Sequence, residues 1–310
     1  MVPPSQPSPI VTAPQATRVE AASLTGMGLG ISAYSLFSLH DAMVKGLITS
    51  LPAPQILFVR SGVIIALCLA IGRTGMVTEL WKSRNRLLIL GRGLMTMAAW
   101  VMFYSAGRAL QLAEMTTLYY FAPVLTTVLA VVFLKEQLTL ARIGAASIGF
   151  FGVLVAANPS GFTIGWPVAL VLAAALCWSV AMILMRTISK SESTLVQVFA
   201  QSLIQFVLMG AVALPFWHGM DTRQIALCIA AGLVGGLGQF TLVEAARRVP
   251  ASVLGTVEYG ALIWSFVFGY LFFAELPAST VYIGAFLVVA AGLTLALSER
   301  RNRRDIIDAP

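Results

Sequence analysis

Long runs of apolar residues, separated by short polar segments, dominate this chain. Ten runs are long enough to cross the roughly 30 Å hydrocarbon core of a bilayer as helices. They lie at about 22–44, 55–72, 87–110, 115–134, 141–157, 166–188, 196–216, 225–244, 251–273 and 281–297. The pattern predicts an all-α integral membrane protein with ten transmembrane helices, five in each half.

A faint internal repeat relates the two halves. The stretch from Arg108 to Glu136 recurs from Arg247 to Glu275, a shift of 139 positions. Identical residues at the shifted positions are Ala106 and Ala245, Thr117 and Thr256, Tyr120 and Tyr259, Ala122 and Ala261, and Val128 and Val267. Because each half crosses the membrane an odd number of times, the second copy starts on the opposite side. We therefore expect two inverted five-helix repeats, an arrangement typical of transporters.

The spans divide the chain into five parts. The first repeat covers 22–157, a linker covers 158–165 and the second repeat covers 166–297. Residues 1–21 are rich in Pro, Ser, Gln and Thr, which predicts a mobile cytoplasmic tail. Residues 298–310 contain four arginines within SerGluArgArgAsnArgArgAsp, which predicts a basic cytoplasmic tail that anchors the topology or lies close to anionic lipid.

Composition and charge agree with this interpretation. The 310 residues are 58% hydrophobic and 11% charged, and the mean hydropathy is +0.88. A soluble domain needs about a quarter charged residues. Of the 20 Lys and Arg residues, all but Lys45, Arg60, Arg108 and Arg223 fall on one side of the predicted topology. The positive-inside rule then predicts an inner-membrane protein with both termini cytoplasmic. The basic pI near 9.7 is explained by topology, and no nucleic-acid partner is expected.

Several kinds of chemistry are not supported by the sequence. Cys68, Cys177 and Cys228 stand singly in different apolar runs, and His40 and His218 are the two histidines. No GxxxxGK[ST] or HExxH motif is present. We therefore expect no enzyme activity, no metal site and no cofactor. Secondary or facilitated transport remains, with a passive solute channel as the alternative from another class.

Ionisable residues within the spans are candidates for function, because a charge in hydrocarbon is costly unless it meets a partner or water. Glu258 lies about seven residues into the ninth span, roughly 10 Å along a helix, at the position equivalent to Tyr119. It would bind substrate or carry a proton, or it would be paired structurally with Arg92 or a backbone donor. Asp41 and His40, close to Lys45, would form an outer gate or a coupling site, or belong to an interfacial hydrogen-bond cluster.

Aromatic and amide side chains complete the predicted cavity. The candidates for substrate binding are Tyr34, Phe37, Trp100, Tyr104, Tyr119, Tyr120, Trp178, Gln239, Tyr259 and Trp264, together with Glu258. Such side chains stack on planar or apolar solutes, and they also simply fill helix interfaces. Both interpretations remain open at this point.

Several segments resemble the drug/metabolite transporter superfamily, in its ten-helix EamA-type branch. They are LeuHisAspAlaMetValLys at 39–45, PheValArg at 58–60, PheTyrSerAlaGlyArgAlaLeu at 103–110, and the AlaPro segment at 122–136 with its echo at 261–275. The second repeat has Leu262 in place of Pro123. The resemblance spans nearly all of 22–297. It implies a central cavity between the repeats, lined by helices 1, 3, 4, 6, 8 and 9, that takes small metabolites.

Together these features predict a carrier of small metabolites that works by alternating access. The first candidate substrate is an amino acid or an amino-acid derivative. The resemblance of AspAlaMetValLys and Arg92 to one subgroup implies a carrier of S-adenosylmethionine or a similar nucleoside-like metabolite as the alternative. In the coupling or gating role we place Asp41, Glu258 and Arg92. The expected partners are a small-molecule substrate and the lipid bilayer. A homodimer is left open, but one chain suffices for such a site.

Overall fold

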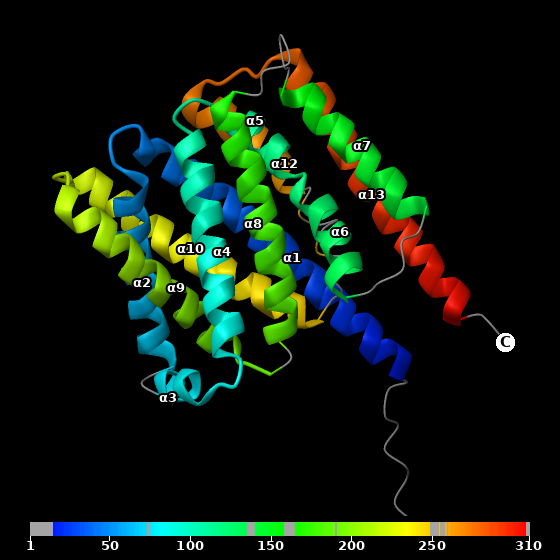
Figure 1. Ribbon diagram of the computed structural model, residues 1–310, viewed down its shortest axis with the longest axis horizontal. Helices are drawn as coiled ribbons and strands as arrows, with labels where there is room; N and C mark the ends of the chain where they lie inside the picture. The colour runs from blue at the N-terminus through cyan, green and yellow to red at the C-terminus, as the bar shows by residue number, and fades with distance from the viewer. Residues whose placement is uncertain are drawn as a thin grey trace, which may run out of the picture.

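The computed structural model is all-helical (Figure 1). It describes residues 15–72, 75–134, 140–157, 165–189, 191–248, 254, 258 and 260–307. The helices are α1 (Gln15–Ile48), α2 (Ala53–Gly72), α3 (Gly75–Lys82), α4 (Arg86–Ala106), α5 (Leu112–Tyr119), α6 (Ala122–Leu134), α7 (Leu140–Ala157), α8 (Trp166–Ile188), α9 (Thr194–Ala213) with the 3₁₀ turn η1 (Leu214–Phe216), α10 (Thr222–Arg248), α12 (Gly260–Phe273) and α13 (Ser279–Ile307).

Long apolar helices confirm the predicted fold class. Within the described residues, five helices are long and apolar enough to cross a membrane: 53–72, 86–106, 166–188, 194–216 and 222–248. Shorter apolar helices occur at 147–156, 260–273 and 279–294. α1 starts at Gln15, earlier than the first predicted span, and α13 continues to Ile307, beyond the last one. The short helix α3 was not predicted.

One predicted span is broken in the structure. The expected single helix 115–134 is two helices, α5 and α6, separated at Tyr120 and Phe121. Pro123 explains the break, because it has no backbone N–H to donate to the carbonyl of Tyr119 and its ring disfavours a continuous helix. Broken helices within a membrane are tolerated where the backbone is buried in protein or lines a cavity.

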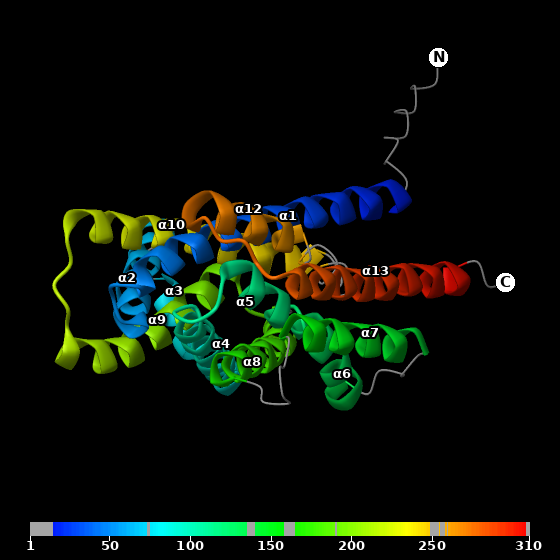
Figure 2. The ribbon, with the colours of Figure 1, turned by 90° about the horizontal axis from the view of Figure 1, so that it is seen from above.

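The contacts between helices follow the two-fold symmetry expected for repeats. α1 of the first half packs along α10 of the second, and α8 of the second half packs in the same way along α4 of the first. The contacts of α10 with α2 and of α4 with α9 form another such pair. α2 packs on α9, and α7 packs on α13, as partners related to each other by the symmetry. Figures 1 and 2 both show α7 and α13 side by side at one edge of the bundle.

One hydrogen bond is repeated by this symmetry. Ser38 on α1 donates to the carbonyl of Ala261 at the start of α12, with a distance of 3.3 Å. Ser179 on α8 donates to the carbonyl of Ala122 at the start of α6, with a distance of 2.8 Å. Ala122 and Ala261 are equivalent in the sequence repeat. The first helix of each half therefore holds the start of a helix from the other half.

Glycines on α10 allow it to pack closely between α1 and α2. A Cβ atom on Gly232 would lie 2.7 Å from Cβ of Val63, and one on Gly235 would lie 2.8 Å from Cδ2 of His40. Both distances are shorter than any real side chain tolerates. Small residues of this kind let membrane helices approach, since lipid offers no competing hydrophobic drive. The close approach fixes His40 and Arg60 in place.

An ion pair joins the halves at one end of the bundle. Nζ of Lys45 on α1 lies 2.7 Å from Oε1 of Glu275, which follows α12, and it also donates to the carbonyl of Leu110 at 2.8 Å. The other oxygen of Glu275 accepts the backbone N–H of Leu112 at 2.8 Å, at the start of α5. Ala274, with φ of 50°, turns the chain so that Glu275 reaches these groups. The cluster connects α1, α5 and α12.

The start of α1, the end of α13 and the short helix α3 lie toward the lower side of Figure 1. The two ends of the helical core are therefore on the same side of the bundle. An even number of crossings has this consequence.

Candidate functional site

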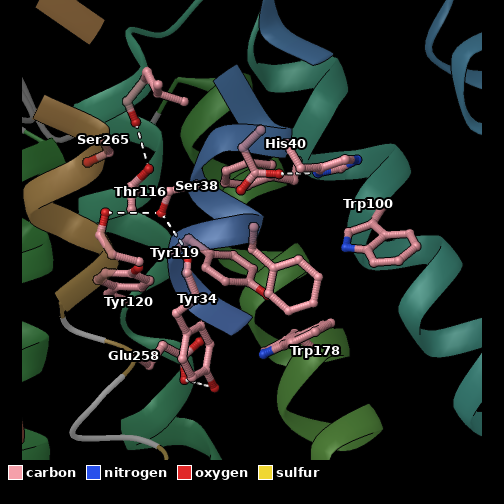
Figure 3. Close-up of a pocket in the computed structure, with 15 residues that line it drawn as sticks. Tyr34, Ser38, His40, Trp100, Thr116, Tyr119, Tyr120, Trp178, Glu258 and Ser265 are labelled. Carbon is pink, nitrogen blue, oxygen red and sulfur yellow. Dashed lines mark hydrogen bonds and ion pairs between the residues drawn. The ribbon is translucent and has the colours of Figure 1, made fainter. Parts of the chain in front are cut away.

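A cavity of about 60 Å³ lies between α1, α4, α5, α8 and the start of α12. This is several times the space that one water molecule needs. Figure 3 shows its lining, which consists of Tyr34, Phe37, Ser38, His40, Asp41, Trp100, Phe103, Leu112, Thr116, Tyr119, Tyr120, Trp178, Glu258, Ala261 and Ser265. Both halves of the chain contribute, and the broken region between α5 and α6 lies at the wall.

A buried carboxyl group occupies one end of the cavity. Glu258 is 5% exposed, and its Oε2 accepts a hydrogen bond from the hydroxyl of Tyr34 at 3.2 Å. The indole N–H of Trp178 points toward the same end (Figure 3) and is near enough to interact with the carboxyl group. It nevertheless makes no hydrogen bond of acceptable geometry within the described residues. Glu258 therefore has one firm neutral partner and an unused donor beside it.

A second carboxyl group occupies the other end. Oδ1 of Asp41 accepts a hydrogen bond from the hydroxyl of Tyr104 at 3.0 Å and lies 3.1 Å from Nδ1 of His40. The side chain of Asp41 is 30% exposed and lines the cavity, whereas that of His40 is 2% exposed. Since a carboxylate oxygen only accepts, the Nδ1 atom of His40 donates to it when Asp41 is ionised.

Aromatic rings form the wall between the two acids. The rings of Phe37 and Trp178 meet edge to face at 6.5 Å, and that of Tyr119 lies 6.3 Å from Trp178 and 5.2 Å from Phe103. These separations are in the range at which aromatic pairs stabilise one another. The rings hold each other in place and present faces and edges to the cavity.

The lining contains acids but no Lys or Arg among the described residues. The acids are Asp41 and Glu258. Ionised carboxyl groups in a low-dielectric pocket attract cations strongly, and aromatic faces add cation–π attraction. The arrangement suits a solute that combines a positively charged group with an apolar or planar part.

The structure brings most of the predicted residues to this cavity. The residues that line it are Tyr34, Phe37, Asp41, Trp100, Tyr119, Tyr120, Trp178 and Glu258. Tyr104 is not part of the lining, but it donates a hydrogen bond to Asp41. Tyr259 lies outside the described residues.

Three predicted residues lie elsewhere. Arg92 donates to Oε1 of Gln197 at 3.1 Å, between α4 and α9, so it is not the partner of Glu258. Trp264 is 41% exposed and donates to the hydroxyl of Ser35 at 3.1 Å on the outside of the bundle. Gln239 is buried on α10, a helix that contributes no lining residue within the described part of the chain. Position within an apolar run does not reveal which way a side chain faces.

Sequence reasoning missed other residues of this region. Phe103 lines the cavity, and it is the neighbour of Tyr104, which was predicted. Arg60 was assigned to an outer segment, but it lies within α2 and is fully buried. The signal was present, because an arginine inside an apolar run is as costly as the glutamate that did attract notice.

These features define a class of protein. A multi-pass helical membrane protein, with two symmetric halves, a broken helix and a polar and aromatic cavity between the halves, is a membrane transporter. The model of the EamA-like transporter family matches residues 24–158 and again 165–297. The chain belongs to this family, with one EamA domain in each half, and the family consists of transporters rather than enzymes.

Relatives with named substrates are similar over most of the chain. The S-adenosylmethionine uptake transporter of Rickettsia felis is 27% identical over 288 residues, which cover 90% of this chain and 94% of that protein. The pseudopaline exporter CntI of Pseudomonas aeruginosa is 26% identical over 281 residues, covering 89% and 97%. A riboflavin transporter of Rhizobium johnstonii is 26% identical, covering 72% of each chain. The chain thus transports small metabolites across a membrane.

A solved crystal structure shares the fold. It superimposes with a TM-score of 0.66 and 19% identity, over 91% of this chain and 98% of the other.

Proposed function

We propose that this protein is a secondary or facilitative carrier of a small amphipathic metabolite that bears an ammonium or sulfonium group. An amino acid or amino-acid derivative is the first candidate. The observation that carries the proposal is the buried carboxyl group of Glu258 in an aromatic cavity that no Lys or Arg lines in the described residues. Glu258 would attract the cationic group of the substrate, and the aromatic rings would hold the remainder.

The transport cycle would be rocking of one repeat against the other around the cavity. The halves contact each other in symmetric pairs, so a second arrangement with the roles of the halves exchanged has a similar set of contacts. The cluster of Lys45, Glu275 and Leu112 joins the halves at one end of the bundle. It would close that end in the conformation described here.

S-adenosylmethionine is the second candidate. It has a sulfonium group, an ammonium group and a planar base, which match the acids and rings of the lining. The similarity to the S-adenosylmethionine uptake transporter favours it as well. A passive channel would use the same helices, and it would differ in showing neither saturation nor counterflow.

The role of Asp41, the orientation of the termini and the oligomeric state complete the proposal. Asp41 would take part in coupling or gating at its end of the cavity. The inner face would carry both termini, because most Lys and Arg residues lie there and positive residues are retained in the cytoplasm. One chain contains the complete cavity, so a monomer would be sufficient.

The test is counterflow in liposomes that contain the purified protein. Labelled amino acids and S-adenosylmethionine would be offered with and without a proton gradient. We expect saturable counterflow of at least one of them, reduced about 100-fold or more by Glu258→Gln, since a charged partner in a dry site contributes about 3 kcal/mol. Glu79→Gln is the matched control, because Glu79 contacts Ser193 away from the cavity.

Unchanged counterflow in a folded Glu258→Gln variant would contradict the proposed role of the carboxyl group. Transport that never saturates would instead identify a channel.

A further inference from the structure

Arg60 on α2 is a buried cation that lacks conventional partners. Its side chain is fully buried, with 0% exposure. Its Nε, Nη1 and Nη2 atoms have no hydrogen-bond partner within the described residues. Arginine is always protonated in proteins, so this charge cannot be avoided by losing a proton. A buried charge without compensation is strongly destabilising, and some group nearby must therefore supply the compensation.

The ring of Trp100 supplies part of it. The guanidinium carbon of Arg60 lies 3.8 Å from the centre of the Trp100 ring, which is the geometry of a cation–π contact. Trp100 also lines the cavity. The guanidinium group is thus separated from the cavity by one aromatic side chain, and the contact gives it no hydrogen bond.

Residues of three neighbouring helices surround the guanidinium group. α1 contributes Asp41 and His40, and α4 contributes Tyr104 beside Trp100. On α10, the facing residue is Gly235, where an added Cβ would lie 3.3 Å from Nε of Arg60 and 3.2 Å from Nε2 of His40. Asp41 lies next to this group of residues, because its Oδ1 is 3.1 Å from Nδ1 of the same His40. It is held by Tyr104 and His40 through Oδ1, and its side chain remains partly exposed to the cavity.

We propose that Arg60 is the internal counter-ion of Asp41, acting across His40 and Tyr104 without a direct hydrogen bond, and that a cationic group in the cavity takes over this role when it reaches Asp41. When the cavity is empty, the charge of Arg60 balances that of Asp41. When a cation reaches Asp41 from the cavity, it competes with Arg60. The charge of Arg60 is then balanced by the cation–π contact with Trp100. The pairing itself depends only on the buried charges, whereas the competition rests on the proposed function.

Melting temperatures of the purified protein test the pairing without any transport measurement. Asp41→Asn leaves Arg60 uncompensated, and Arg60→Met leaves Asp41 uncompensated, so we expect each to lower the melting temperature by several degrees. The double variant removes both charges, and we expect it to melt at a higher temperature than either single variant. Losses that simply add would overturn the pairing.

Arg92 provides the matched control. It is also buried, at 5% exposure, but its partner is Gln197. We expect the losses of Asp41→Asn and Arg92→Met to add. Compensation in this pair as well would mean that any two charge deletions offset each other, and it would overturn the assignment to Arg60.

Two ligands of nearly equal shape test the competition. S-adenosylmethionine carries a sulfonium charge that S-adenosylhomocysteine lacks. We expect Arg60→Met to raise the preference for the charged ligand about tenfold or more, and Asp41→Asn to lower it. An unchanged preference in a folded Arg60→Met variant would overturn the competition. Failure of wild-type protein to bind either ligand would count against this substrate class in the proposed function, while the melting temperatures still decide the pairing.

Discussion

A single hydroxyl group holds the acid that carries the proposed function. Tyr34 and Glu258 are 224 residues apart in sequence, and the hydrogen bond between them is buried. Sequence reasoning found Glu258 because an acid within an apolar run is costly. It did not identify the partner, because the partner belongs to the other half of the chain and only the packing of α1 against the start of α12 brings the two together.

Loss of this hydroxyl group is a test at the residue scale. We expect Tyr34→Phe to lower the initial rate of counterflow about fivefold, because a hydrogen bond that orients a carboxyl group contributes about 1 kcal/mol. In a Glu258→Gln background the same change should have little further effect. An equal loss in both backgrounds would show that Tyr34 acts independently of Glu258.

A charge within an apolar run is costly whether it belongs to an acid or to an arginine. Arg60 lies about five residues into its apolar run and Glu258 about seven into the ninth, yet Arg60 was assigned to the outer segments. Trp264 shows the opposite error, because it lies mid-run but faces outward. Apolar runs predict that a residue is in the membrane, and they contain no information on which face of the helix meets a neighbour, since all faces are apolar.

At the scale of elements, the break between α5 and α6 is the feature that a span pattern could not predict. Hydropathy is continuous from 115 to 134, and only Pro123 signals an interruption. A kinked helix and two separate helices would have the same pattern of hydropathy along the sequence. A contact from outside the segment holds the start of α6, because Ser179 of α8 donates a hydrogen bond to the carbonyl of Ala122.

Restoring the missing donor tests the role of this break. Pro123→Ala supplies a backbone N–H that the carbonyl of Tyr119 can accept, so α5 and α6 can join. We expect counterflow to fall about tenfold while the melting temperature is unchanged or higher. Loss of both activity and stability would indicate a packing defect instead.

At the scale of the whole molecule, the sequence predicted the two repeats and their all-helical fold, because length, hydropathy and the echo of 108–136 are properties of the chain alone. It could not predict which contacts join the halves at one end of the bundle. The two inverted repeats have the same pattern of apolar and polar residues. The two ends of the bundle differ through particular contacts, such as that between Lys45 and Glu275.

Opening of this end can be measured by thiol labelling. In a variant whose native cysteines are replaced by alanine, Leu112→Cys places a thiol beside the contact. We expect Lys45→Met to raise its labelling rate in detergent about tenfold, since a charge-assisted hydrogen bond contributes about 1.5 kcal/mol. Lys82→Met, on the distant helix α3, is the control. Equal labelling in all three proteins would rule out closure by this ion pair.

The paired serine bonds have a further consequence for how such a chain is put together. Ser38 reaches the second half, and Ser179 returns the same bond to the first. Neither bond depends on the peptide that connects the halves. A single five-helix chain that inserted in both orientations would form the two bonds with a second copy of itself. Fusion of the halves therefore supplies proximity and freedom to diverge, so that one copy could acquire Glu258 while the other kept Tyr119.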